Sequence, residues 1–331
     1  MANIKKVAEL AGTSPATVSR VINGTANVSP ETRQRVMDAI AATEFVPNEI
    51  ARTLFKKTSS IIGLILPSIR NPYFTQLAAI LDELALERGY RIFLCNTGYD
   101  LEKERAALQN LVAMHADSII VASCNQKLLE DINACPVPIV AMDAMLSGAD
   151  VEACIYCDYQ QGGRLAMEHL LENGCKNIVC IQGPQIRYSA RARYEGYQAV
   201  CRERGIPEQT VECDYDFFQG MAMTEELLNH YPDVDGIIAC NDIVAISTYK
   251  VLHKRGIPVP RQIQLVGFDD VSMSSLISPE LTTICQPLKA MAEKAISLIA
   301  NRELVRLKGV KFVFPVTLTK RETTIMKGDN Q

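Results

Sequence analysis

Polar side chains follow several apolar runs of this chain, at the point where each run ends. Asp143 comes directly after Val140-Ala141-Met142, and Asn241 follows the run that ends at Cys240. The full set is Ser68, Asn71, Tyr73, Phe74, Asp143, Asn241, Asp242, Asp269, Asp270 and Gln286. Carboxylates and amides can hydrogen-bond to pairs of hydroxyl groups, and an aromatic face can pack against the C–H face of a sugar ring. These residue types therefore predict a site for a sugar.

A simpler explanation exists for each of these residues taken alone. Asn and Asp at strand-to-helix turns often cap the helix that follows, and Asn71 and Asn241 both have that setting. Five or more such residues at equivalent strand ends favour a binding site over a set of unrelated caps.

A second group of residues, Thr13–Gly24, predicts a short helix that can enter a DNA major groove. Ser14 and Pro15 suit its start, and Asn23-Gly24 suits its end. Its buried stripe is Val18, Val21 and Ile22. The residues left facing outward are Pro15, Ala16, Ser19 and Arg20. Small side chains allow close approach to base edges, and an arginine can bridge guanine O6 and N7.

The sequence shows no nucleophile–base pair and no metal-ligand spacing. Cys154 and Cys157 form a single C-x-x-C in a strand-like segment without a second ligand pair, which favours ordinary buried thiols. Gln161-Gly162-Gly163 fits neither the dinucleotide-binding nor the P-loop spacing. The histidines are scattered, at His115, His169, His230 and His253. We therefore expect no enzymatic activity, no metal and no cofactor.

From Ser60 onward, apolar strand-like runs alternate with amphipathic stretches of helix length. The expected strands are Ile61–Leu66, Arg91–Cys95, Asp117–Ala122, Val137–Met142, Asn177–Gln182, Asp235–Cys240 and Ile263–Phe268. The expected helices lie near Pro72–Arg88, Glu102–Met114, Gln160–Asn173, Arg191–Arg204, Met221–Asn229, Asp242–Lys254 and Leu288–Asn301. This order predicts parallel sheets covered on both faces. Such sheets bind ligands outside the carboxyl ends of their strands, where the polar set lies.

Two further helices are expected beside the groove-entering one. The first spans Asn3–Ala11, and a third begins at Ser29-Pro30. Three short helices make a small headpiece that is only marginally stable alone, and any small three-helix bundle would show the same caps and stripes. The next segment, Pro47–Lys57, is able to form a helix but is too short to be stable by itself in water.

The overall composition separates a basic head from an acidic body. Residues 1–58 carry eight Lys and Arg against five Asp and Glu, a net +3, which leaves −7 for the remainder of a chain with a total of −4. A length of 331 residues predicts two or three domains. Eleven cysteines, an odd number, with no signal-peptide pattern and no membrane-length apolar run, predict reduced thiols in a cytoplasmic, nucleoid-associated protein without a membrane contact.

The segment from Ile4 to Lys57 resembles the DNA-binding headpiece and hinge of the LacI family of bacterial repressors. The resemblance implies base reading by Pro15, Ala16 and Arg20. The residues it places nearer the phosphates are Ser14, Thr17, Ser19 and Asn23. In that family the hinge helix folds only on operator DNA, beside its dimer mate, and a leucine wedges into a minor-groove step. Ala51 and Leu54 occupy the hinge positions of that kind here.

The resemblance extends over nearly the whole body. The segments that carry it are Arg191–Tyr197, Asn241-Asp242, Val266–Asp270 and Leu281–Pro287. They resemble the effector domain of LacI-type repressors, which is similar to periplasmic pentose and hexose binding proteins. The resemblance implies ligand contacts at Phe74, Asp143, Arg193, Tyr215, Asn241, Asp269 and Gln286. We add Ser68 and Asn71 from their place after the first strand.

One position departs from the family pattern. Many sugar-binding relatives carry arginine after the aspartate at 143, whereas this chain has Ala144, which removes one sugar contact. The segment Arg88–Thr97, together with Gln286-Pro287, is nevertheless most similar to repressors of ribose operons.

These observations predict a helix-turn-helix headpiece joined to an α/β effector domain of the periplasmic-binding-protein type, with two doubly wound parallel-sheet lobes. We expect the headpiece at residues 1–46, the hinge helix and linker at 47–59 and the effector domain at 60–331. Within the last, lobe 1 is expected at about 60–156 with 288–314, and lobe 2 at about 157–287 with 315–331.

The expected function is a homodimeric repressor that binds pseudo-palindromic operator DNA and is controlled by ribose or a related sugar. A global catabolite regulator with a phosphocarrier protein as co-effector is the alternative within this class. A sugar-active enzyme and a plain sugar-binding protein are more remote. The leucine-rich side of Pro72–Arg88 is interpreted either as a dimer face or as ordinary core.

Overall fold

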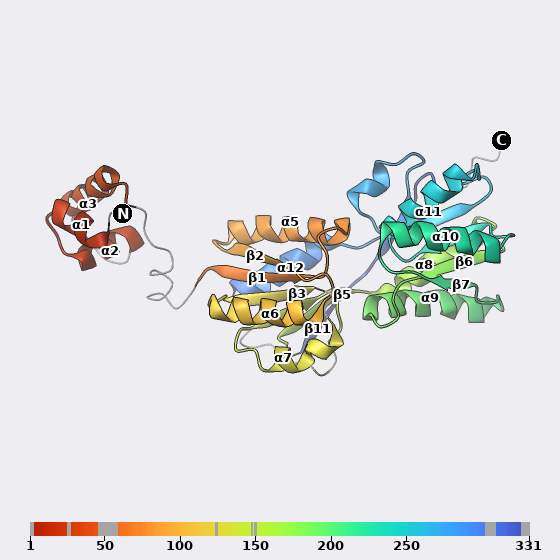
Figure 1. Cartoon of the computed structure of the whole chain (residues 1–331), viewed down its shortest axis with the longest axis horizontal. Coiled ribbons are helices and arrows are strands. Elements are labelled where there is room, and N and C mark those ends of the chain that lie inside the picture. Colours follow the sequence, from red (N-terminus) through yellow and green to blue (C-terminus); the bar gives the residue numbers. More distant parts are fainter. Residues whose placement is uncertain are drawn as a thin grey trace. The chain divides into compact units, whose positions relative to one another are not determined.

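The computed structural model describes residues 3–24, 28–45, 59–122, 125–146, 148, 151–301 and 309–325 (Figure 1). The chain divides into two compact units, Met1–Ser59 and Ser60–Gln331, and each is considered by itself. The hinge positions Ala51 and Leu54 lie outside the described residues, as does the side chain of Asn23.

The first unit is a bundle of α1 (Ile4–Leu10), α2 (Pro15–Asn23) and α3 (Pro30–Thr43). The predicted caps are present: the Ser14 hydroxyl oxygen accepts from the Thr17 amide at 3.1 Å, and Gly24 ends α2 with a left-handed φ of 64°. The shared core consists of Val7, Ala8, Ala11, Val18, Val21, Val36 and Ala39. The helix-turn-helix arrangement expected from the sequence is therefore confirmed.

The first lobe of the second unit is built on one six-stranded parallel sheet. Its strands are β1 (Ile61–Leu66), β2 (Arg91–Asn96), β3 (Ser118–Ala122), β4 (Ile139–Met142), β5 (Ala153–Cys157) and β11 (Val310–Phe314), in the order β11-β5-β4-β3-β1-β2. Its helices are α5 (Pro72–Glu87), α6 (Leu101–Ala113), η1 (Gln126–Leu128), α7 (Leu129–Asn133) and α12 (Leu288–Ala300). Helix α5 packs against α12, and α6 and α7 lie across the sheet from α5 (Figure 1).

The second lobe has a sheet of matching design. Its strands are β6 (Ile178–Gln182), β7 (Thr210–Glu212), β8 (Gly236–Ala239), β9 (Gln264–Asp269), β10 (Thr282–Cys285) and β12 (Thr317–Thr319), in the order β12-β10-β9-β8-β6-β7. Only β12 runs antiparallel to its neighbour. The helices are α8 (Tyr159–Glu172), α9 (Tyr188–Arg204), α10 (Phe217–His230), α11 (Asp242–Lys254) and η2 (Ser272–Ser275).

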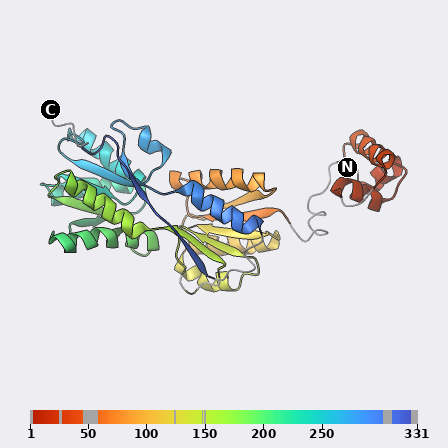
Figure 2. The same cartoon turned by 180° about the vertical axis from the view of Figure 1, so that it is seen from behind.

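The chain passes between the lobes three times. It crosses after β5, after β10 and between β11 and β12, and Figure 2 shows these connections running side by side. Each sheet therefore combines segments that are distant in sequence. The two lobes are held together as one unit by these crossings.

The seven expected strands are all present. The expected set omits β5, although the segment around Cys154 and Cys157 is interpreted as strand-like, and the sequence missed β7, β10–β12 and α7. Strands β7 and β12 have three residues each, too few for a pattern to be recognised. Residues Leu77, Leu81 and Ala85 of α5 are fully buried within a single chain. Of the two interpretations of this side of α5, ordinary core is the one that the structure confirms.

Candidate ligand site and nucleic-acid interface

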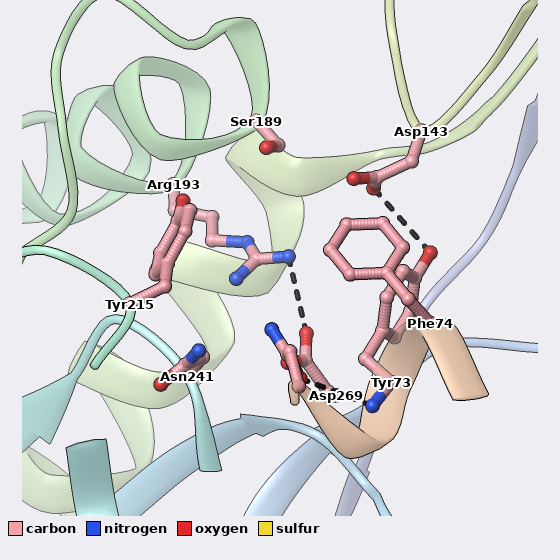
Figure 3. A pocket seen from close by; sticks show the side chains of 9 residues that line it. Tyr73, Phe74, Asp143, Ser189, Arg193, Tyr215, Asn241 and Asp269 are labelled. Atoms are coloured by element: carbon pink, nitrogen blue, oxygen red, sulfur yellow. Dashed lines mark hydrogen bonds and ion pairs between the residues drawn. The ribbon is translucent and has the colours of Figure 1, made fainter. Parts of the chain in front are cut away.

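A cavity lies between the two lobes at the carboxyl ends of their strands (Figure 3). It encloses about 260 Å³ of space free of atoms, part of it open to solvent. Its lining residues are Asn71, Tyr73, Phe74, Asp143, Ser189, Arg193, Tyr215, Asn241 and Asp269. Asp143 follows β4, Asn241 follows β8 and Asp269 ends β9, as expected for parallel sheets that bind ligands at this edge.

Arg193 is the cation at the centre of the cavity wall. Its Nη2 lies 3.2 Å from Asp269 Oδ1, and its Nη1 donates to the Cys240 carbonyl at 2.6 Å. Its guanidinium carbon lies 3.7 Å from the centre of the Phe268 ring, so one face is covered. Burial by itself would lower the pKa of Arg193, but the negative charge of Asp269 outweighs it and the net pKa is raised. The side chain is a permanent donor.

Asp269 accepts from two donors within this network. Gln286 Nε2 donates to its Oδ1 at 2.8 Å, while the Gln286 carbonyl oxygen accepts from the Tyr73 hydroxyl at 3.3 Å. Burial raises the pKa of Asp269, and Arg193 opposes that rise. Gln286 thus orients Asp269 from behind and does not itself line the cavity.

Asp143 faces the same cavity from the first lobe. Its Oδ1 accepts from the Tyr159 hydroxyl at 2.5 Å and from the Tyr73 hydroxyl at 3.4 Å. Its φ of 53° is left-handed, which turns the chain sharply as it leaves β4. Burial raises the pKa of this carboxyl group, while Arg193 lowers it.

The two asparagines both cap a helix and line the cavity. Asn241 Oδ1 accepts from the Val244 amide at 2.9 Å, and Asn71 Oδ1 accepts from the Tyr73 amide at 3.0 Å. Since each side-chain oxygen is occupied by the cap, the amide NH₂ groups are what these residues can offer to a ligand. The capping explanation weighed from the sequence is therefore confirmed, and the role of these asparagines in ligand binding stays a prediction.

Two buried polar atoms around the cavity lack a partner within the described residues. They are Arg193 Nε and the hydroxyl oxygen of Tyr215. Buried donors are almost always satisfied in folded proteins, so these two atoms mark places where a bound molecule would complete the hydrogen bonding. With Phe74 supplying an aromatic face, the cavity has the chemistry that suits a sugar ring.

The predicted residues do not all reach this cavity. Ser68 lies apart from it, where its hydroxyl oxygen accepts from the Arg70 amide at 3.1 Å. Asp242 and Asp270, which directly follow Asn241 and Asp269 in the chain, hold loops in place and do not line the cavity. Asp242 accepts from the Ser274 hydroxyl at 2.7 Å, and Asp270 forms an ion pair with Arg321 at 2.6 Å.

Sequence reasoning missed Ser189 and Tyr159 as members of the site. Both stand at the start of a helix that follows a strand, so the same edge rule applies to them. The sequence had left β5 out of the strand set and had started α9 at Arg191, which hid both positions. Correct element boundaries would have been the signal that identified them.

Arg193 owes its position to close packing between α8 and α9. A Cβ atom on Gly163 would lie 2.0 Å from the Arg193 carbonyl oxygen, and one on Gly196 would lie 2.0 Å from the Gln160 carbonyl oxygen. The helices therefore touch through their backbones, which only glycine at both positions permits. This contact places the Arg193 side chain against Phe268 and the cavity.

The headpiece presents the predicted reading face on α2. Pro15, Ala16 and Arg20 are exposed, and Ser19 is half-buried. The hydroxyl groups of Ser14 and Thr17 lie 3.0 Å apart at the start of the helix. The small side chains of Pro15 and Ala16 allow the start of α2 to approach base edges closely. Arg20, one turn later, is exposed and can hydrogen-bond to a base.

Family comparisons match both units. Residues 3–48 match the lacI family of bacterial regulatory proteins, and residues 59–305 match the periplasmic binding proteins and sugar binding domain of the LacI family. The chain belongs to the LacI family. It is a DNA-binding transcription regulator with a sugar-binding type of effector domain, as the sequence predicted.

Individual relatives cover most or nearly all of this LacI-family chain. A ribose operon repressor from Halalkalibacterium halodurans is 36% identical over 98% of this chain and 97% of its own. The lac repressor dimer bound to operator and the anti-inducer ONPF has a TM-score of 0.89 at 28% identity, over 98% of this chain and 99% of that one. A LacI-type regulator from Alkaliphilus metalliredigens complexed with D-xylulofuranose has a TM-score of 0.72 at 32% identity, over 81% of this chain and 100% of that one.

Two further observations apply to the described part of this LacI-family chain. No helix there is long and apolar enough to cross a membrane. No group of three or more His, Cys, Asp and Glu side chains there is arranged to hold a metal ion.

Proposed function

We propose that this protein is a homodimeric repressor of a pentose-utilisation operon, and that a pentose in the interlobe cavity sets its affinity for operator DNA. The observation that carries the proposal is the convergence of Asp143, Arg193 and Asp269 on one cavity in a chain with a DNA-reading headpiece. The ribose operon repressor relative and the D-xylulofuranose complex support a five-carbon sugar. The role is binding and regulation, not catalysis.

The cavity wall offers a chemically suitable side chain to each part of a pentose ring. Two carboxylates can accept from hydroxyl groups, and the free donors of Arg193, Asn241 and Tyr215 can bond to ring and hydroxyl oxygens. Phe74 is nearly fully buried beside them and offers a flat apolar surface.

The coupling to DNA is proposed to act through the relative angle of the lobes. A ligand that bonds to both lobes at once favours the arrangement in which both sets of contacts form. In the dimer this would change the spacing of the two first lobes and thereby of the segments that precede them and contain Ala51 and Leu54. Loss or gain of the wedge contact in the minor groove then changes operator affinity.

Exposed apolar side chains support the homodimer. β2 is an edge strand of its sheet, and Phe93 and Leu94 on it are 42% and 41% exposed. Ile69 and Leu86, also in the first lobe, are exposed to a similar degree. Exposed apolar side chains on a sheet edge are costly in a monomer, so a second copy that covers them accounts for their presence.

The decisive experiment is a thermal-shift screen of the full chain against ribose, ribose 5-phosphate, xylulose, fructose, glucose, sucrose and purines. A pentose that binds the native state raises the melting temperature by mass action, and operator binding with and without it gives the sign of regulation. Arg193→Ala should remove the shift and the regulation while operator binding survives. A normal ligand response in Arg193→Ala would contradict the proposal that the pentose binds in the cavity around Arg193.

Removal of residues 1–58 tests whether operator binding and pentose binding reside in separate parts of the chain. The remaining protein should keep the pentose-induced shift and lose specific operator binding. The catabolite-regulator alternative predicts instead that a phosphocarrier protein, and not a pentose, changes operator affinity. A screen in which no sugar raises the melting temperature would favour that alternative.

A further inference from the structure

The sugar cavity does not end at Asp143 and Ser189. Both residues also line a second cavity of about 320 Å³, together with Ala144, Arg187 and Tyr188. A third cavity of about 290 Å³ adjoins it and again includes Arg187. The space between the lobes therefore continues from the sugar site toward Arg187, and a ligand larger than one ring has room to extend there.

Arg187 is a cation in this extension that forms no ion pair within 4.0 Å with any residue that the structure describes, although Glu104 and Asp143 feel its charge. Its guanidinium carbon lies 3.6 Å from the centre of the Tyr99 ring, so a face of the group is stacked on the first lobe. Its Nε is buried, and no acceptor for it exists among the described residues. A stacked guanidinium keeps its N–H bonds free in its own plane, which is the geometry that binds an oxyanion with two parallel hydrogen bonds.

The start of α9 adds neutral donors beside this cation. Arg187 is the N-cap of this 17-residue helix, no side chain accepts from its first turn, and that turn contains no acidic residue. Ser189 is only 4% exposed and lines both cavities, and its hydroxyl group makes no hydrogen bond with any described residue (Figure 3). The free amides of a helix N-terminus and a buried hydroxyl both favour a bound anion.

The residue that follows Asp143 in the wall of the second cavity, Ala144, has a small side chain. Ala144 lines the second cavity at the position where the family pattern has arginine, so the space next to Asp143 is open. The positive charge on this side of the ligand comes from α9 in the second lobe instead of from the loop after β4.

The neighbouring carboxyl groups are engaged elsewhere. Asp143 accepts from Tyr159 and Tyr73, and Glu104 accepts from the Asn125 amide at 3.2 Å. Neither forms an ion pair with Arg187. Burial raises the pKa of both carboxyl groups, and the positive charge of Arg187 acts in the opposite direction on each.

We propose that the effector is a sugar that carries an oxyanion, as a phosphate ester or a carboxylate, and that Arg187, Ser189 and the first turn of α9 bind this group. The inference rests on the proposed function, since the sugar ring is placed in the cavity around Arg193. It adds a second subsite to that cavity and makes a charged pentose, not the free sugar, the preferred ligand.

The test is calorimetric titration of the full chain with D-ribose, D-ribose 5-phosphate and D-riburonate, which carries a carboxylate at C5 and keeps the furanose ring. The variant is Arg187→Gln, which removes the charge and the guanidinium group and leaves a shorter, polar side chain. The matched control is Arg191→Gln, one turn further along α9, where the side chain is 45% exposed and lines none of the three cavities. Circular dichroism and thermal unfolding of the ligand-free variants show that each is folded.

The expected result is that one of the two anions binds the unmodified protein at least tenfold more tightly than ribose. This ratio should fall to near one in Arg187→Gln and persist in Arg191→Gln. Preference for the phosphate or for the acid identifies the source of the oxyanion.

Two results would overturn the inference. If ribose binds as tightly as both anions, or if the preference survives in Arg187→Gln, the sugar site stands and the anion subsite does not. If none of the three ligands binds, the pentose assignment itself fails and the inference fails with it.

Discussion

The Tyr159 hydroxyl, at the start of α8 in the second lobe, donates a hydrogen bond of 2.5 Å to Asp143 Oδ1, which follows β4 in the first lobe. Asp143 also lines the ligand cavity. A ligand hydroxyl that donates to Asp143 therefore shares its acceptor with the Tyr159 hydroxyl, whose hydrogen bond to Asp143 joins the lobes. This relationship connects occupancy of the cavity to the interlobe geometry by a single carboxyl group.

Tyr159→Phe should weaken this coupling. The ring remains, so packing against Phe268 is kept, but Asp143 loses its shortest hydrogen bond. We expect the change in operator affinity on adding effector to shrink at least threefold, with a loss of about 1–3 kcal/mol in effector binding, which is typical of a bond to a charged group. Titration of operator at zero and saturating effector measures both quantities.

The control for this change is Tyr194→Phe, which removes a tyrosine hydroxyl that donates to Glu208 within the second lobe. Its coupling should match that of the unmodified protein. Equal losses in the two variants would mean that the Tyr159–Asp143 bond has no special part in the coupling.

Gly163→Ala should both destabilise the protein and impair the ligand response. The new methyl group would meet the Arg193 carbonyl oxygen at 2.0 Å, so α8 and α9 must separate. Overpacking of this kind costs roughly 1–3 kcal/mol, and it shifts the helix that carries Arg193. Chemical denaturation and effector titration report the two effects. Gln161→Ala, at an exposed position of the same helix, should change stability by less than about 0.5 kcal/mol.

A stable Gly163→Ala variant with unaltered ligand binding would show that α8 can move without moving Arg193. The alternative substitution, Gly196→Ala, meets a different backbone atom, the Gln160 carbonyl oxygen, and should give the same result.

How far the sequence could predict this site is clear from particular residues. Asn241 and Asp269 stand at the ends of the apolar strands β8 and β9 of one sheet, so the edge rule for parallel sheets places them together without any coordinates. The same rule places Asp143 at the edge of the other sheet, after β4, but it does not state that the two edges face each other. The sequence also marks both ends of α2, since Ser14 and Gly24 have the residue types that the caps need.

Other features depend on distance in three dimensions. The hydrogen bond from Tyr73 to Gln286 joins residues 213 positions apart, and no local pattern encodes it. That Gln286 supports Asp269 from behind, and that Ser68 turns away, depends on side-chain directions after each crossing between lobes. Gly163 and Gly196 look like unremarkable helix residues until α8 and α9 are seen in contact.

His169 should make the stability of the second unit depend on acid pH. It is buried on α8, where its Nε2 lies 2.9 Å from the Thr324 hydroxyl and 3.1 Å from Asn173 Nδ2. Burial lowers the pKa of His169 from 6.5 to about 4. The unfolded chain thus binds a proton between these values and the folded chain does not, so stability is full above pH 6.5 and falls toward pH 4, by about 3 kcal/mol in total.

His169→Gln should flatten this dependence, because the side-chain amide oxygen can still accept but cannot take up a proton. Urea denaturation at several pH values between 4 and 7.5 gives the slope for each protein. His253→Gln on α11, at an exposed position, is the matched control. An acid-induced loss in His169→Gln as large as in the unmodified protein would assign the effect to other groups.

Arg20→Ala should relax sequence discrimination at one base pair of the operator. Arg20 is exposed on α2 one turn after Pro15 and Ala16, where its guanidinium can bond to guanine O6 and N7 together. Loss of such a pair costs roughly 1–3 kcal/mol against the correct base and little against the others. Binding to a set of operators that differ at single positions measures the loss of affinity for each base pair.

Arg20→Lys keeps the charge and loses the paired geometry, so it should relax discrimination at the same position while retaining more of the general affinity. Equal loss of affinity by Arg20→Ala on every operator would instead identify Arg20 as a phosphate contact, since phosphates carry no base sequence.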